Sequence, residues 1–254
     1  MASENLIFQL EHAEYAYPYE KPVLRDISLS VREGEKLCIL GANGCGKSTL
    51  LKILAGLLLP QKGTFAAFGE EITAKKLNDD RFSKSYHRRL GFIFQNSEAQ
   101  LFCSTVEEEI AFGPLQLGFS ADGVKQRISD ISAMLNIGHL LGKPPFKLSG
   151  GEKKKVALAC VLVMNPDVLI LDEPTNGLDP RTQAWLVGLL VSLNKAGKTI
   201  LTATHNLELV HKLSDRAILF SEDHRIVADQ PTDALIRDCA LLREVNLVGE
   251  DYYI

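Results

Sequence analysis

Residues 41–49 carry the clearest chemistry in the chain, because they read Gly-Ala-Asn-Gly-Cys-Gly-Lys-Ser-Thr and fit the phosphate-binding spacing G-x-x-x-x-G-K-[ST]. Glycines let successive backbone N–H groups converge on phosphate oxygens, and a following helix N-terminus adds a favourable dipole. Lys47 would then neutralise the β- and γ-phosphates, and Ser48 would offer its hydroxyl to Mg²⁺. The predicted nucleoside triphosphate site comprises Gly41, Ala42, Asn43, Gly44, Cys45, Gly46, Lys47, Ser48 and Thr49.

The segments on either side of this loop have the order that the motif requires. Lys36–Leu40 has the pattern of a buried strand, and Leu50–Leu58 has that of an apolar helix. The alternative is a glycine-rich turn that carries Lys-Ser by chance, and these flanks argue against it. We also expect the Cys45 thiol, at a helix N-terminus among backbone N–H groups, to have a lowered pKa and high reactivity.

A second candidate group lies at the end of an apolar run, where Val168–Leu171 is followed by Asp172 and Glu173. Four apolar residues indicate a strand buried on both faces, as in a parallel sheet. Asp172 would hold Mg²⁺, and Glu173, on the other side of the strand, would polarise an attacking water. The alternative is a strand end that turns to solvent, which the upstream loop argues against.

A third group, Leu-Ser-Gly-Gly-Glu at residues 148–152, also combines glycines with a helix start. Roughly 100 residues separate it from Thr49, so it is free to serve a different nucleotide from the one held by residues 41–49. Gln95 follows Phe92–Phe94, and His205 follows the apolar strand pattern Thr199–Ala203.

Together these segments resemble the ATP-binding-cassette (ABC) ATPases over nearly the whole chain. Residues 148–152 resemble the family signature LSGGQ, with Glu152 in place of the commoner glutamine. Asp172 and Glu173 resemble the Walker B aspartate and the catalytic glutamate. Gln95 resembles the Q-loop glutamine, and His205 resembles the switch histidine that contacts the γ-phosphate.

The resemblance implies ATP and Mg²⁺ as cofactors, and it assigns a role to each matching position. The positions implied for catalysis are Glu173, His205 and Gln95, and those implied for the metal are Ser48, Gln95 and Asp172. Asp179 matches the D-loop. The positions implied to bind the nucleotide of a partner subunit are Ser149, Gly150, Gly151 and Glu152. An aromatic residue near the N-terminus stacks on adenine in this family, and Tyr17 is the best match, while Tyr15 and Tyr19 could simply pack. Family cassettes pair head to tail, so the partner is a second ABC ATPase subunit, identical or paralogous.

A narrower resemblance joins Phe94–Phe102 and Thr105–Pro114 to the ATPases of energy-coupling-factor importers, which take up cobalt, nickel or vitamins in prokaryotes. It implies a transmembrane coupling subunit, a substrate-binding membrane subunit and a place on the cytoplasmic face of the cell membrane. Residues Gln95 to Phe102 would form part of the groove that grips the coupling subunit. Two features depart from many relatives: Glu152, and a chain that ends soon after Asn246 without a longer extension.

Three other function classes share some of these features. Another ABC importer or exporter class would use the same ATPase chemistry. A cassette acting on DNA or ribosomes would be expected to carry long insertions or a second cassette, and the sequence shows neither. A nucleotide-binding module without turnover is disfavoured by the presence of Glu173 and His205.

Composition agrees with a globular enzyme of 254 residues, with 46% hydrophobic and 24% charged residues. A net charge of −4 gives no general attraction to nucleic acid, and Lys153–Lys155 are expected on an exposed helix face. Five cysteines without metal or disulfide spacing suit a reducing cytosol. Apolar runs are shorter than the roughly 20 residues of a membrane span, so another chain would supply any pore.

The expected fold class is α/β: a P-loop NTPase core with an antiparallel β subdomain and an inserted α-helical subdomain. One domain, 1–254, would comprise a RecA-like core with its β subdomain at about 1–95 and 160–254, and a helical subdomain at about 100–158. Residues 6–40 alternate apolar and polar positions in short runs, Leu6–Leu10 and Ile27–Val31, which predicts antiparallel strands. Short strands and a polar loop are expected over 61–95.

Helix signals are strongest between the Q-loop and the signature. Thr105, with Glu108 three residues later, predicts a capped helix that Gly113-Pro114 would end. Ala121–Leu135 is amphipathic at helical spacing. Alternating helix and strand patterns then follow at Gln183–Ala196, Thr199–Ala203 and Ala217–Phe220.

Overall fold

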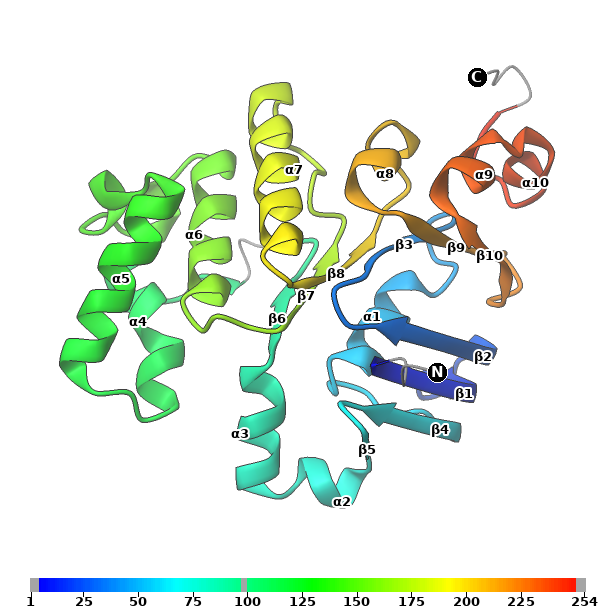
Figure 1. Cartoon of the computed structure of the whole chain (residues 1–254), viewed down its shortest axis with the longest axis horizontal. Coiled ribbons are helices and arrows are strands. Elements are labelled where there is room, and N and C mark those ends of the chain that lie inside the picture. Colours follow the sequence, from blue (N-terminus) through cyan, green and yellow to red (C-terminus); the bar gives the residue numbers. More distant parts are fainter. Residues whose placement is uncertain (1–4, 97–99, 250–254) are drawn as a thin grey trace.

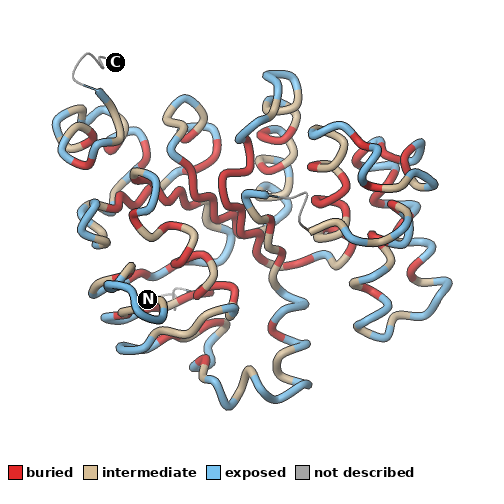
Figure 2. The backbone as a smooth tube through the Cα atoms, turned by 180° about the vertical axis from the view of Figure 1, so that it is seen from behind, coloured by how far each residue is buried: buried red, intermediate tan, exposed pale blue. Residues whose placement is uncertain are grey.

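The computed structural model describes residues 5–96 and 100–249, and its centre is a six-stranded sheet in the order β10-β9-β3-β8-β7-β6. Its strands are β3 (Lys36–Leu40), β6 (Leu90–Ile93), β7 (Val168–Asp172), β8 (Thr199–Ala203), β9 (Arg216–Phe220) and β10 (Ile226–Pro231). All neighbours pair in parallel except β10, which returns antiparallel to β9. Both faces are covered, so β7 and β8 are buried at every residue, as Figure 2 shows for the centre of the molecule.

A second, antiparallel sheet has the order β2-β1-β4-β5. It comprises β1 (Leu6–Ala16), β2 (Pro22–Arg32), β4 (Lys62–Ala67) and β5 (Glu70–Glu71). Helix α1 (Lys47–Leu54) lies between the two sheets, where Leu50, Leu51 and Ile53 are fully buried (Figure 1). The antiparallel strands predicted near the N-terminus are confirmed, whereas Lys36–Leu40 joins the parallel sheet.

Helices α4 (Val106–Gln116), α5 (Ala121–Leu135) and α6 (Gly150–Leu162) form a group beside β6, with short 3-10 turns η2 (Gly138–Leu140) and η3 (Pro145–Lys147) before α6 (Figure 1). The predicted cap is confirmed, because the Thr105 side chain accepts the Glu108 N–H. The predicted end at Gly113-Pro114 is wrong. A proline removes one N–H, but less than a turn remains after it, and the Leu117 N–H closes the helix on the Gly113 carbonyl.

The remaining helices cover the core sheet and its edges. Helices α7 (Pro180–Lys195), α8 (Leu207–Leu213), α9 (Thr232–Arg237) and α10 (Cys239–Glu244) lie on the face opposite α1 (Figure 1). The polar segment before β6, expected to be a loop, forms α2 (Ala74–Leu77) and α3 (Asp80–Arg88) instead. Thr73 and Asp79 cap these two helices, a local signal that the sequence already contained.

The two faces of the core sheet pack in two different hydrophobic clusters. Along β7, Leu169 and Leu171 pack with the helices of the α4–α6 group, whereas Val168 and Ile170 pack with α1 and the antiparallel sheet. Among the described helices, none is long and apolar enough to cross a membrane.

Candidate functional site

The loop between β3 and α1 packs tightly against Val23 and Phe220, and two of its glycines cannot be replaced by a residue with a side chain. A Cβ on Gly46, whose φ is +115°, would lie 2.4 Å from the Val23 carbonyl oxygen. A Cβ on Gly41, whose φ is +149°, would lie 2.7 Å from the Cys45 sulfur. Backbone conformation and lack of space therefore both require glycine at these positions.

In front of this loop is a cavity of about 360 Å³. Its lining comprises Tyr17, Glu20, Val23, Asn43, Gly44, Gly46, Lys47, Ser48, Thr49, Gln95, Asp172 and Glu173. Gly41, Ala42 and Cys45, which the sequence also assigned to the nucleotide site, do not line it. The structure thus brings Tyr17, most of the predicted loop, Gln95 and the Asp172-Glu173 pair to one place.

Lys47 and Tyr17 are held at the cavity by hydrogen bonds to the loop and to α1. Lys47 Nζ donates to the Gly41 carbonyl at 2.7 Å and to the Ala42 carbonyl at 3.0 Å. The Tyr17 hydroxyl lies 3.3 Å from Thr49 Oγ1, so its ring borders the cavity. An ammonium has three N–H groups, which leaves Lys47 one more donor for an anion.

Asp172, at the carboxyl end of β7, is 5% exposed. Within residues 5–96 and 100–249, its Oδ1 is buried without a hydrogen-bond partner. Burial raises the pKa of Asp172, whereas a hydrogen bond from the Ser48 side chain opposes the rise. A buried carboxylate oxygen without a donor, beside a hydroxyl and the Gln95 side chain, is an oxygen-rich set that fits Mg²⁺.

Glu173 is held by two side chains that follow β8. Its Oε1 lies 2.7 Å from His205 Nδ1, and Thr204 Oγ1 donates to its Oε2 at 3.2 Å. Glu173 also has a φ of +46°, an uncommon conformation for a residue with a side chain. These contacts fix a carboxylate at the wall of the cavity, and Thr204 is a member of this group that the sequence did not single out.

The signature segment lies elsewhere, at the N-terminus of α6. Ser149 and Glu152 form a capping box: Glu152 Oε2 accepts the Ser149 N–H at 2.8 Å, and Ser149 Oγ accepts the Glu152 N–H. The backbone bond from Ser149 lowers the pKa of Glu152. None of Ser149, Gly150, Gly151 and Glu152 lines the 360 Å³ cavity.

Asp179, the predicted D-loop residue, is the N-cap of α7. Its carboxylate accepts the N–H groups of Arg181 and Thr182, each at 3.0 Å, and the Thr182 hydroxyl at 2.6 Å. These bonds, the Thr182 hydroxyl first, lower the pKa of Asp179. Asp179 therefore fixes the turn between β7 and α7.

Two expectations about single side chains are wrong. Cys45 is 2% exposed, and burial raises the pKa of its thiol, because the sulfur packs behind the loop beside Gly41 and away from the cavity. Lys154 is 3% exposed, so Lys153–Lys155 do not share one exposed face. Three consecutive helical residues span about 200° around the axis, so one of them points toward the core.

A larger, more open cavity of about 610 Å³ adjoins the first and shares Ser48, Gln95 and Asp172 with it. Its other lining residues are Lys52, Phe94, Asn96, Gln100 and Phe102. The predicted partner groove, Gln95 to Phe102, maps here, except for residues 97–99, which lie outside the described residues. Phe102 is 67% exposed, and its ring packs edge-on against the exposed Phe112 ring, with 5.0 Å between the ring centres.

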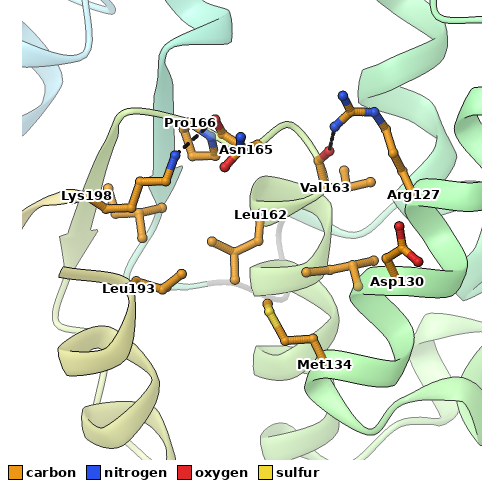
Figure 3. Close-up of a pocket in the computed structure, with 11 residues that line it drawn as sticks. Arg127, Asp130, Met134, Leu162, Val163, Asn165, Pro166, Leu193 and Lys198 are labelled. Carbon is orange, nitrogen blue, oxygen red and sulfur yellow. Dashed lines mark hydrogen bonds between the residues drawn. The ribbon is translucent and has the colours of Figure 1, made fainter. Parts of the chain in front are cut away.

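A third cavity, of about 220 Å³, lies between α5, α6 and α7 (Figure 3). Apolar side chains that include Met134, Leu162 and Leu193 line it. At its rim, Arg127 Nη1 donates to the Val163 carbonyl at 2.9 Å. It shares no residue with the first cavity, so it lies outside the candidate site.

A glycine-rich loop between a parallel strand and a helix, with an acidic pair at the end of β7, two strands away in the same sheet, defines a P-loop NTPase. Residues 24–176 match the family described as ABC transporter. The solved structure of CbiO1 from Clostridium perfringens, part of the ABC transporter complex CbiONQ, superposes with a TM-score of 0.82 at 34% identity, covering 96% of each chain. The chain therefore belongs to the ATP-binding subunits of ABC transporters, and it hydrolyses ATP.

Curated relatives agree with this assignment. A putative ABC transporter ATP-binding protein of Methanosarcina acetivorans is 49% identical over 98% of this chain and 91% of its own length. The nickel import ATP-binding protein LarO of Lactiplantibacillus plantarum is 45% identical over 85% of this chain and 89% of its own. The energy-coupling factor transporter ATP-binding protein EcfA2 of Methanospirillum hungatei is 42% identical over 95% of this chain and 59% of its own.

Proposed function

We propose that this chain is the ATPase of an energy-coupling-factor importer for nickel ions, cobalt ions or a vitamin. It would act as a head-to-tail dimer that drives a separate transmembrane subunit from the cytoplasmic face of the membrane. One observation carries the dimer: the cavity contains the phosphate loop and the acidic pair, but the signature lies outside it. The similarity to nickel import and energy-coupling factor ATPases supports the importer class.

In the proposed site, the backbone N–H groups of the loop and Lys47 bind the phosphates, and the Tyr17 ring stacks on adenine. Ser48, Gln95 and Asp172 would hold Mg²⁺, which supplies positive charge that offsets the charge developing on the transferred phosphoryl group. Glu173 accepts the proton of the attacking water, and the contact with His205 holds its carboxylate in place. His205 does not line the cavity, but its side chain is half-exposed beside Glu173, where it would contact the γ-phosphate.

The partner subunit completes the site. The capping box leaves Gly150 and Gly151, the glycines of the signature, in the first turn of α6, and Ser149 and Gly150 are exposed. That end of α6 would bind the γ-phosphate of the ATP held by the other subunit. Hydrolysis removes this bridge and lets the dimer open.

The 610 Å³ cavity is the proposed docking groove for the transmembrane subunit. Its lining includes Phe102, whose exposed ring contacts the exposed ring of Phe112 on α4, and Leu115, three residues further along α4, is 53% exposed. Buried Glu109 fixes the backbone at Phe102, because its Oε2 accepts the N–H groups of Phe102 at 2.9 Å and Cys103 at 2.6 Å. Sharing Gln95 with the nucleotide cavity would couple docking to hydrolysis.

The Glu173→Gln variant tests the catalytic part of this proposal. Glutamine keeps the size and one acceptor oxygen, so ATP binding should stay within about twofold, whereas turnover should fall at least ~10²-fold. The variant should also sediment as a dimer with ATP and as a monomer with ADP. Wild-type turnover would show that Glu173 is not the catalytic carboxylate.

The transport part needs the membrane subunits of the complex. Cells that express the whole complex should accumulate labelled nickel or cobalt, or a vitamin, with the wild-type subunit and not with Glu173→Gln. Phe102→Asp should abolish copurification with the transmembrane subunit and leave ATP binding intact, while Leu57→Asp, at an exposed apolar residue after α1, serves as the matched control. Accumulation of none of these substrates would overturn the proposed importer class.

A further inference from the structure

The turn between β9 and β10, residues 221–225, touches the back of the phosphate loop. His224 Nδ1 lies 3.1 Å from the Cys45 carbonyl oxygen, across 179 positions of sequence. A carbonyl oxygen cannot donate, so Nδ1 carries the proton in this bond. The backbone carbonyl of His224 in turn accepts the Arg25 N–H of β2 at 3.0 Å. In Figure 1 this turn reaches from the core sheet toward the first half of β2.

The bond matters because of the peptide unit to which the Cys45 carbonyl belongs. A trans peptide is planar, and its C=O and N–H point in opposite directions. The N–H on the other side of this carbonyl is that of Gly46, which lines the 360 Å³ cavity. A donor that holds the Cys45 oxygen at the back of the loop therefore holds the Gly46 N–H toward the cavity.

Without such a donor, this peptide unit has little to hold it. It joins Cys45 to Gly46, so its rotation changes only ψ of Cys45 and φ of Gly46. Gly46 has a φ of +115°, and a glycine crosses between backbone conformations at small cost. Within the loop, the Cys45 N–H makes only a long hydrogen bond, at 3.4 Å, to the Ala42 carbonyl. Rotation of the 45–46 peptide would turn the N–H away from the cavity and present a carbonyl oxygen there.

The turn that carries His224 is itself well anchored. The His224 N–H donates to the Ser221 carbonyl at 3.1 Å, and the Ser221 N–H donates to the Arg225 carbonyl at 3.0 Å. Beyond α10, Asn246 Nδ2 donates to Glu222 Oε1 at 2.9 Å. The imidazole thus stands on a fixed support that reaches to the C-terminal helices.

We propose that His224 is a positioning residue for nucleotide binding: it orients the Gly46 N–H toward a phosphate oxygen by holding the Cys45 carbonyl from behind. The inference rests on the proposed assignment of residues 41–49 as the phosphate loop. His224 does not line the cavity, so it acts through the loop and not on the nucleotide.

Two variants distinguish the loss of the hydrogen-bond donor from a change in the backbone of the turn. His224 has a φ of +64°, which both glycine and asparagine adopt readily. His224→Gly removes the donor without backbone strain, and we expect the Kd for ADP and the KM for ATP to rise roughly 3- to 10-fold with kcat within about twofold. His224→Asn places an amide N–H near the position of Nδ1 and should restore both constants to within about twofold of wild type. ADP is measured by equilibrium titration of the monomer.

Either of two outcomes overturns the proposal. It is overturned if His224→Gly binds ADP as tightly as wild type, or if His224→Asn is impaired as much as His224→Gly while both unfold at the wild-type temperature. Lys47→Ala is measured in parallel to separate this inference from the assignment on which it rests. Unchanged nucleotide binding in Lys47→Ala would refute that assignment, whereas loss of binding there with no effect in His224→Gly would refute the role of His224 alone.

Discussion

Lys154 offers a quantitative test, because its side chain is a basic group in the core. It is 3% exposed, and burial, partly offset by the charge of Asp172, lowers its pKa from 10.5 to about 8. One pKa unit corresponds to 1.36 kcal/mol, so keeping this ammonium charged in the folded state costs about 3 kcal/mol below pH 8. Replacing Lys154 with methionine, which has a similar length and no charge, should stabilise the fold by up to that amount at pH 7.

The sign of the pH dependence follows from proton binding. Between pH 8 and 10.5 the unfolded chain keeps the proton on Lys154 while the folded chain releases it, so the free energy of unfolding rises with pH. This stability is fully present above 10.5 and is lost as the pH falls through about 8. Lys154→Met lacks the group, so its advantage over wild type should shrink from about 3 kcal/mol at pH 7 toward zero near pH 10.5.

Urea unfolding of wild type and Lys154→Met at pH 7, 8, 9 and 10 measures this difference directly. Lys155→Met is the matched control, because Lys155 is only partly buried on the same helix and its ammonium lies 4.8 Å from the centre of the Trp185 ring. The control should follow the wild-type pH dependence. If the curves for wild type and Lys154→Met run parallel over this range, Lys154 does not lose its proton as its burial predicts.

Three further predictions concern the signature and the phosphate loop. Ser149→Arg should leave ATP binding to the same chain within about twofold but abolish hydrolysis, since the side chain would fill the partner's γ-phosphate site; a monomer that hydrolyses ATP at full rate on dilution would contradict this. Glu152→Gln keeps an acceptor for the Ser149 N–H, so the free energy of unfolding should change by less than about 0.5 kcal/mol in urea titrations. Cys45 has a buried thiol with a raised pKa, so maleimide at pH 7 should leave it unmodified in the native protein and label it after unfolding. Mass spectrometry detects the label, and rapid labelling of the native protein that MgATP prevents would refute the burial of this thiol.

The sequence by itself predicted the parts of this protein that depend on neighbouring residues. The loop at 41–49 needs glycines, a lysine and a strand–helix context, all of which are local. The strand before Asp172 follows from four consecutive apolar residues, and the helices at 106–116 and 121–135 begin at the side-chain caps Thr105 and Ser120. The polar segment that contains α2 and α3 predicts a loop by its composition, but Thr73 and Asp79 cap two helices there, since polar residues suit an exposed helix as well as a loop.

Only the tertiary structure decided which side of an element a residue faces and what meets it there. Cys45 turns into the core, because the sharp loop sends its side chain opposite to the N–H groups that face the cavity. His224 reaches the Cys45 carbonyl across 179 positions, and Thr204 reaches Glu173 across 31. Such contacts depend on how the β-sheet brings distant strands together, and the pattern of nearby residues does not encode that pairing.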